Sequence, residues 1–324
     1  AEEYQRKILD QGSATSDLHL LTRATRRLGE IRRKRGEFED ALTLLHESLQ
    51  HAVEQDDLEG QILTRKSLAN TYKHMSRLDE ALDFFKKGLE GSRMLSHKKL
   101  EAEHLNDIAT LLIERHELTE AKDRLEEAAE IIRGEPAFRA ILVSVILNLG
   151  VVAYFQKNIQ WAIDRFREAA KIAEQIGDVM NTMIARHNIG EMLIEFGEFE
   201  QAYQEFETCL HLAENVGNET ERINNAMLVG FTKTKLGKYD EGVLQLSEVI
   251  AECEKRGYWN FFCEASIYLG RAHWARKDRA QAEAAFHRAL KRAFELKNPS
   301  LIQRTQEEIE KLNQTSGKNV EGIA

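Results

Sequence analysis

The chain repeats itself about every 40 residues, and this period constrains its fold more than any other feature. A pair made of an aliphatic residue and a small residue recurs seven times, in steps of 40, 40, 41, 40, 40 and 40 residues. The pairs are Leu28-Gly29, Leu68-Ala69, Ile108-Ala109, Leu149-Gly150, Ile189-Gly190, Val229-Gly230 and Leu269-Gly270. A second series keeps the same steps: Ala41, Ala81, Ala121, Ala162, Ala202, Gly242 and Ala282. Two series in step indicate stacked repeats rather than independent domains.

Each copy has the pattern of a helical hairpin. In residues 186–213, apolar and small residues recur at helical spacing in two runs that Gly197 separates. Residues that end helices lie in the links between copies, at Asp56-Asp57, Gly177-Asp178, Gly217-Asn218, Gly257 and Asn298-Pro299. Pro136 lies in the link after copy three and accounts for the single 41-residue step. With only two prolines and many good helix formers, the chain is predicted to be all-α.

The spacing resembles the tetratricopeptide repeat family over about residues 22–296. Copy two carries the family pattern at Tyr72, Ala81, Phe85 and Leu89, and copy five at Gly197, Ala202, Phe206 and Leu210. The usual Trp and Pro are absent, and the period is about six residues longer than the typical 34, which predicts longer helices and links. The resemblance implies a right-handed superhelical solenoid of antiparallel helix pairs, with the first helix of each pair on the concave face.

The period also sets the expected boundaries. We expect a remnant of a preceding repeat or an N-terminal cap in residues 1–21, seven repeats in 22–300, a capping helix in 301–313 and a flexible tail in 314–324. Counting back 40 residues from Ala41 reaches Ala1, so residues 1–10 look like the second helix of a further repeat. This suggests that the chain is a piece of a longer array.

Composition and motifs exclude several classes of function. A formal charge of −9 argues against general nucleic-acid binding. No apolar run reaches about 18 residues, so no membrane insertion is expected. The three cysteines lack metal-ligand spacing, and Cys209 takes the place of Ser48 and Ala169 as a small buried residue. We find no catalytic motif, no metal site and no cofactor site, and predict a cytoplasmic protein that is not an enzyme.

Three groups of side chains on the first helices are the predicted binding residues. The first is basic and would attract an acidic or phosphorylated segment; it comprises Arg23, Arg26, Arg33, Lys34, Lys66 and Lys73. Lys66 and Asn70 also resemble half of the carboxylate clamp of chaperone-tail adaptors. The remaining clamp positions hold Asp107, Ser144 and Asn148, which argues against that function. The alternative for the basic group is a merely solubilising surface.

The second group is apolar. Residues 141–155 are apolar nearly all round, so we expect Val151, Tyr154 and Phe155 to be covered by a ligand or by the rest of a central hairpin. Farther along the chain, Met227, Phe231, Tyr268, Arg271 and Trp274 occupy inward positions.

The third group is polar. Asn106, Asn148 and Asn188 recur near one inner position, with His187 and Glu191 beside the last of them. Because an amide can both donate to and accept from one peptide unit, such a ladder would hold an extended backbone. It is similar to the ladders of long-repeat proteins such as kinesin light chains, Leu-Gly-Asn-repeat regulators and bacterial Rap-type proteins. Hydrogen bonding between the helices themselves is the alternative.

The sequence therefore predicts a non-catalytic scaffold that binds an extended or helical segment of a partner protein in a concave groove. The partner would have an acidic portion and apolar anchors. The alternative is a sensory or regulatory arm of a larger signalling or transcription-regulatory protein, responsive to a peptide or small effector. Self-assembly through residues 141–155 is a third possibility, and the oligomeric state is left open.

Overall fold

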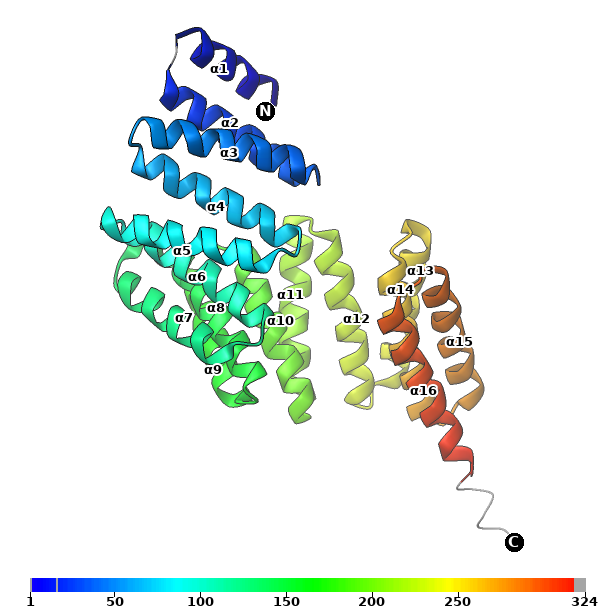
Figure 1. The fold of residues 1–324 in the computed structure, drawn as a ribbon. Helices are drawn as coiled ribbons and strands as arrows, with labels where there is room; N and C mark the ends of the chain where they lie inside the picture. The colour runs from blue at the N-terminus through cyan, green and yellow to red at the C-terminus, as the bar shows by residue number, and fades with distance from the viewer. Residues whose placement is uncertain (1, 16, 318–324) are drawn as a thin grey trace. The chain divides into compact units, whose positions relative to one another are not determined.

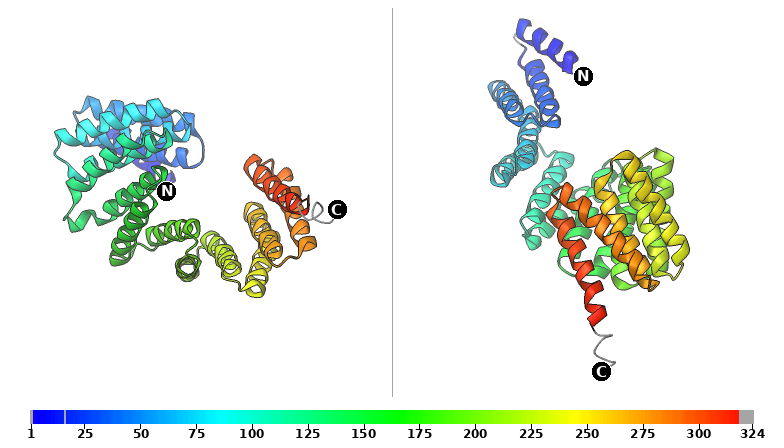
Figure 2. Two further views of the ribbon diagram at one scale, coloured as in Figure 1. Left: turned by 90° about the horizontal axis from the view of Figure 1, so that it is seen from below. Right: turned by 90° about the vertical axis from the view of Figure 1, so that its right-hand side faces the viewer.

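A computed structural model describes residues 2–15 and 17–317 of the chain, which form two compact units, residues 1–178 and 179–324. Within the described ranges the regular structure is helical, with no strand. Consecutive helices lie side by side and antiparallel within each unit (Figure 1, Figure 2). The predicted all-α class and paired helices are confirmed.

The first unit contains nine α-helices and one short 3-10 helix among its described residues. They are α1 (Glu2–Thr15), α2 (Leu18–Lys34), α3 (Phe38–Glu54), α4 (Leu58–His74), α5 (Leu78–Met94), α6 (Lys98–Glu114), α7 (Leu118–Ile132), η1 (Pro136–Phe138), α8 (Arg139–Phe155) and α9 (Ile159–Ile176). The predicted interruption at Pro136 is the 3-10 helix, which leads into α8.

The second unit contains seven helices among its described residues. They are α10 (Val179–Phe196), α11 (Phe199–Val216), α12 (Glu219–Lys235), α13 (Tyr239–Arg256), α14 (Trp259–Ala275), α15 (Arg279–Glu295) and α16 (Pro299–Gly317). Residues 314–317, placed in a flexible tail by the sequence, extend α16, and the rest of that predicted tail lies outside the described residues.

A left-handed residue marks most turns between helices and fixes where they end. Seven are glycines and seven are other residues, from Gly36 and Asp56 to Lys277 and Lys297, and most are 20 residues apart. At several helix starts a side chain caps the first turn; Asp57, for example, accepts a hydrogen bond from the Gly60 amide. Helices mostly of 17 or 18 residues and links mostly of two or three residues, such as 177–178 and 55–57, make up the period. Most of the 40 residues of each copy are therefore helical.

Close helix contact explains the small residues of both series. A Cβ added at Gly190 would lie 2.7 Å from the ring of Phe206, which is fully buried on the second helix of the same pair. The ring of Phe166 lies against Gly150, and that of Phe286 against Gly270, in the same way. The alanines of the second series are also fully buried, because the two helices cross there.

The most apolar segment is longer than the limit of about 18 residues that the sequence analysis expected no apolar run to reach. Pro136–Phe155 is 20 residues with a mean hydropathy of 2.0, long and apolar enough to cross a bilayer by length and composition alone. In the structure, α8 packs against α6, α7 and α9, and Val145, Val152 and Ala153 are fully buried. This packing buries 44% of the apolar window.

Candidate functional site

The predicted binding residues all lie on the first helices of the pairs. We call the surface made by α2, α4, α6 and α8 in the first unit, and by α10, α12, α14 and α16 in the second, the first-helix face. Polar or aromatic side chains 37 to 42 residues apart connect successive first helices within each unit. Several side chains that the sequence predicts to contact a ligand therefore contact each other in the structure.

Much of the predicted basic group is neutralised inside the first unit. Arg26 pairs with Glu30 at 3.0 Å, and Glu30 also accepts a hydrogen bond from Ser67 on the next first helix. Desolvation lowers the pKa of Arg26, whose side chain is mostly covered. Arg26 thus stabilises the stack rather than offering a free charge to a ligand.

Lys66 and Lys73 on α4 are paired with carboxylates on α6. The Lys66 ammonium lies 2.6 Å from Glu103 and 3.3 Å from Asp107, while Lys73 lies 3.0 Å from Glu114. Burial opposes the charge of Lys66, but Asp107 and Glu103 outweigh it and the pKa of Lys66 is raised. Asn70 is half-buried between them on α4. The lysine of the half clamp suggested by the sequence is thus paired with carboxylates of the chain itself.

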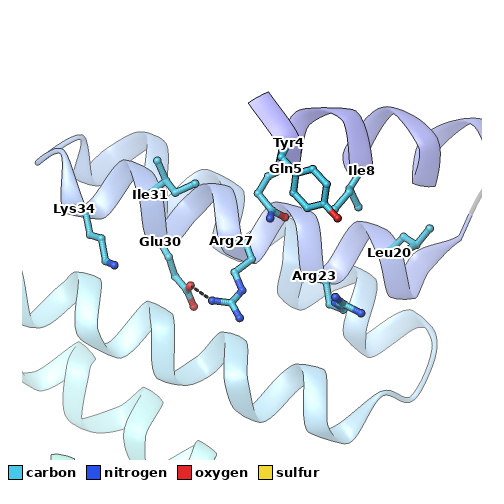
Figure 3. Close-up of a pocket in the computed structure, with 9 residues that line it drawn as sticks. All are labelled: Tyr4, Gln5, Ile8, Leu20, Arg23, Arg27, Glu30, Ile31 and Lys34. Atoms are coloured by element: carbon cyan, nitrogen blue, oxygen red, sulfur yellow. Dashed lines mark hydrogen bonds and ion pairs between the residues drawn. The ribbon is translucent and has the colours of Figure 1, made fainter. Parts of the chain in front are cut away.

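Three of the six residues in the predicted basic group have no ion pair among the described residues. They are Arg23, Arg33 and Lys34. Arg23 and Lys34 line a pocket of about 370 Å³ between α1 and α2, with Arg27 and Glu30 between them. Figure 3 shows Tyr4 and Ile8 of α1 above this basic strip of α2. The surviving positive charge of the predicted basic group is thus on α2, beside an apolar wall.

The asparagine ladder is present in part as a bond between helices. The Asn148 amide nitrogen donates to the Asn106 oxygen over 2.9 Å, connecting α8 to α6. Asn188 is half-buried on α10, in the second unit. In the structure the Asn106–Asn148 pair therefore satisfies itself, as the alternative interpretation of the sequence expected.

The end of α8 carries an exposed aromatic side chain with half-buried apolar neighbours. Phe155 is 41% exposed, and Tyr154 and Val151 are half-buried. The Phe155 ring lies 5.8 Å from that of Tyr154 and 5.9 Å from that of His116, measured between centroids. Val143, Val145 and Val152 on α8 are buried, whereas Ile141 and Leu142 near its start are half-buried.

In the second unit, His187 connects α10 to α12. Its ring lies 3.4 Å from the Asn225 oxygen and 3.6 Å from Glu191, and packs edge-on against Phe206. Burial disfavours the charged imidazole, yet Glu191 and Asn225 outweigh burial and raise the pKa of His187. Glu191 itself is exposed.

Met227 and Phe231 do not present the surface that their predicted role requires. Met227 is 2% exposed and Phe231 5% exposed, because α12 packs against α13 and α14. The Phe231 ring is 4.5 Å from that of Tyr268, which is half-buried. These residues connect helices, and of the three only Tyr268 is open to a partner.

Arg271 and Trp274 border a pocket that includes residues missed by the sequence analysis. Arg271 donates two hydrogen bonds to Glu308, of 3.1 and 3.0 Å, and Lys311 lies 2.8 Å from the same carboxylate. Burial works against the charge of Glu308, but Arg271 and Lys311 lower its pKa. Arg271 and Glu308 are 37 residues apart in the sequence, as are Glu30 and Ser67, and Lys66 and Glu103. This shared spacing could have identified the Arg271–Glu308 pair from the sequence.

The reactive residue types are in structural positions. Burial raises the pKa of the Cys209 thiol to about 12 and those of Cys253 and Cys263 to about 11, so none is poised as a nucleophile. Within residues 2–15 and 17–317, no group of three or more His, Cys, Asp or Glu side chains is arranged to hold a metal ion.

Comparison with known proteins agrees with this architecture. Residues 20–94 match the tetratricopeptide repeat family. No curated protein matches the chain in sequence. Among solved structures, the chain is similar to a signal transduction ATPase with numerous domains from Pyrococcus horikoshii that has a tetratricopeptide repeat sensor. The identity is 18% and the TM-score 0.73, over 89% of this chain; the chain spans only 46% of that protein.

Two further structures are similar over most of their own length. The apo form of RapI is 15% identical with a TM-score of 0.72, over 93% of this chain and 87% of that one. The apo form of the quorum sensor NprR from B. thuringiensis is 17% identical with a TM-score of 0.65, over 88% and 80%. At these identities the likeness is one of fold.

Proposed function

We propose that this chain binds a segment of a partner protein on its first-helix face. Residues 20–94 match the tetratricopeptide repeat family, and the chain is similar in its helix-pair fold to repeat proteins over most of its length. In this proposal the protein is a non-catalytic, cytoplasmic scaffold. The partner segment is extended or helical, with an acidic portion and apolar anchors.

The observation that carries the proposal is the mixture of accessible side chains on this face of the first unit. Arg23 and Lys34 on α2 are exposed cations with no ion pair among the described residues. Phe155 and Tyr154 at the end of α8 form an accessible aromatic pair. Aromatic anchors surrounded by polar groups are typical of protein-binding surfaces.

The two kinds of side chain suggest how a segment is bound. Its acidic part lies toward α2, where charge attracts it, and its apolar side chains contact Tyr154 and Phe155. Asn106 on α6 and Asn148 on α8 belong to the same first-helix face, and the Asn148 amide nitrogen donates to the Asn106 oxygen over 2.9 Å. Either amide can exchange that bond for one to the ligand backbone at little net cost, because one hydrogen bond replaces another.

The test is capture of a partner by the purified chain from a lysate of its source, followed by the same experiment with variants. We expect Tyr154→Ala/Phe155→Ala to reduce capture of an identified partner about tenfold or more, as removal of a hot spot does. Asn148→Ala/Asn188→Ala is expected to weaken it less. Phe294→Ala is the matched control, since Phe294 is an exposed aromatic residue on the second helix α15.

Circular dichroism must show that each variant is folded. Undiminished capture by both double variants would refute binding on the first-helix face, and an equal loss in Phe294→Ala would show that the aromatic effect is not specific to that face.

A second proposal is a sensory arm, in which a bound peptide or effector changes the state of an attached output domain. It is supported by the similarity in fold to the repeat sensor of the P. horikoshii protein and to NprR, described as a quorum sensor. An ATPase, kinase or DNA-binding domain encoded in the same gene would favour this function over that of a free-standing scaffold.

A further inference from the structure

We propose that a pocket in the second unit, bounded by α12, α14 and α16, binds a carboxylate of the partner segment next to an apolar side chain. This deepens the proposed function by naming the chemistry of one contact. It places a contact with an acidic group in the second unit, whereas the predicted basic group, Arg23 to Lys73, lies in the first.

The pocket has a volume of about 410 Å³ and is lined by Lys235, Arg271, Trp274, Ala275, Glu308 and Lys311. Three of these side chains are cations and one is an anion, so the lining has a formal charge of +2 on a chain whose net charge is −9. A local excess of positive charge in a recess attracts a single anionic group.

Lys235, the last residue of α12, supplies the accessible positive charge. It is exposed and pairs with no carboxylate among the residues that the structure describes. Its ammonium lies 5.4 Å from the ring centre of Phe231 and 5.8 Å from that of Phe199. Contact with two rings holds a cation in place while leaving its hydrogen-bond donors available.

Glu308 shows that the other side of the pocket already binds a carboxylate. Its side chain is 6% exposed and accepts two hydrogen bonds from Arg271 and one from Lys311. Arg271 uses Nε and Nη2 for these bonds, and its side chain remains 35% exposed. The fixed carboxylate holds the guanidinium in position beside Lys235, so that an incoming carboxylate meets cations whose geometry is already set.

Trp274 provides the apolar wall. It packs on the buried cluster that contains Phe286 and Ile267, and it also lines the pocket. A side chain adjoining the bound carboxylate would lie on this surface. The combination of one anion site and one apolar surface fits an acidic residue beside an aliphatic or aromatic residue in a peptide, and not the regularly spaced phosphates of a nucleic acid.

The test uses three fluorescein-labelled hexapeptides and fluorescence polarisation on the full chain. The first is Gly-Leu-Phe-Glu-Leu-Gly with an amidated C-terminus, the second has Gln in place of Glu, and the third is the Gln peptide with a free C-terminal carboxylate. We expect the Glu peptide or the free-carboxylate peptide to bind about tenfold more tightly than the neutral one, since a charge-assisted hydrogen bond provides a difference of that order. Which of the two is preferred identifies the source of the carboxylate.

Charge reversal then tests the pocket itself. Lys235→Glu is expected to abolish the preference for a carboxylate and to favour a peptide with Lys in place of Glu. Lys291→Glu is the matched control, because Lys291 is exposed on the second helix α15 of the same unit. Trp274→Phe is expected to weaken all peptides moderately.

Equal binding of the charged and neutral peptides, or a preference that survives Lys235→Glu, overturns the inference while leaving the capture experiment on the first unit unaffected. Absence of binding by every peptide up to about 1 mM, the weakest affinity worth calling recognition, also overturns it.

Discussion

Two of the connections between neighbouring first helices, one in each unit, differ in their chemistry. In the first unit the connections between α2, α4 and α6 are charged and partly exposed, as in Lys66 with Glu103 and Asp107. Between α12 and α14 of the second unit the connection is the buried Phe231 ring, which packs against the Tyr268 ring at an interplanar angle of 32°. The fold therefore specifies where successive repeats touch, while the sequence decides whether the contact is apolar, polar or ionic.

This difference has consequences for stability and for binding. A charged link can exchange its partner for a ligand carboxylate, but it is screened by salt and depends on pH. A buried aromatic link is independent of both and can be lost only by repacking the helices. The Lys66 link is thus open to competition by a ligand, whereas the contact of Phe231 with Tyr268 holds α12 against α14.

The largest effect is expected from removing the aromatic link. Phe231→Ala should lower the free energy of unfolding by about 3 kcal/mol or more, since a buried ring is replaced by a cavity. Urea unfolding followed by circular dichroism measures it, with Phe294→Ala as the exposed control. A loss no greater than that of the control would show that the Phe231–Tyr268 contact is not what stabilises α12 against α14.

A buried histidine in the first unit gives the next largest effect. His104 on α6 is fully buried, and burial lowers its pKa to about 4. Unfolding restores an ordinary pKa, so the unfolded state binds the proton more readily between pH 6.5 and 4. Stability is therefore present above pH 6.5 and falls as the pH decreases, by about 3 kcal/mol in total for a shift of this size.

His104→Gln should remove that part of the pH dependence. The measurement is the difference in urea midpoint between pH 7 and pH 4.5 for the variant and the unchanged chain. An identical pH dependence in both would mean that His104 is not the group responsible.

Breaking the charged link at Lys66 should lower the free energy of unfolding by less than the changes at Phe231 or His104. Lys66→Ala leaves Asp107 without its partner, and desolvation already raises the pKa of Asp107 against the effect of Lys66. Because both side chains are about a quarter exposed, we expect a loss of about 2 kcal/mol, below the 3–5 typical of a fully buried pair. Asp107→Asn in the Lys66→Ala background should restore part of it, and the double-mutant cycle measures the coupling.

The sequence was sufficient for features that repeat and insufficient for those that occur once. Gly190, Ala202 and Phe206 could be placed because the same close contact recurs in several copies. The pairing of Lys66 was missed because it depends on side chains in the neighbouring copy, which a pattern within one copy does not contain. The link from Arg271 to Glu308 was missed for the same reason, although its 37-residue spacing is shared by other links. The bond between Asn106 and Asn148 was one of two interpretations that the sequence left open.

The smallest effect should come from His187, and it has the opposite sign to that of His104. Glu191 and Asn225 raise the pKa of His187 above 6.5, so its charged form stabilises the contact between α10 and α12. That contribution is fully present below pH 6.5 and is lost as the pH rises through the folded-state value. His187→Gln keeps a hydrogen-bond donor for Asn225 but cannot be charged, so it should be less stable than the unchanged chain at pH 6 and close to it at pH 8. A difference that grows toward pH 8 instead would show that the neutral imidazole stabilises this contact, and that the two histidines respond to burial alike.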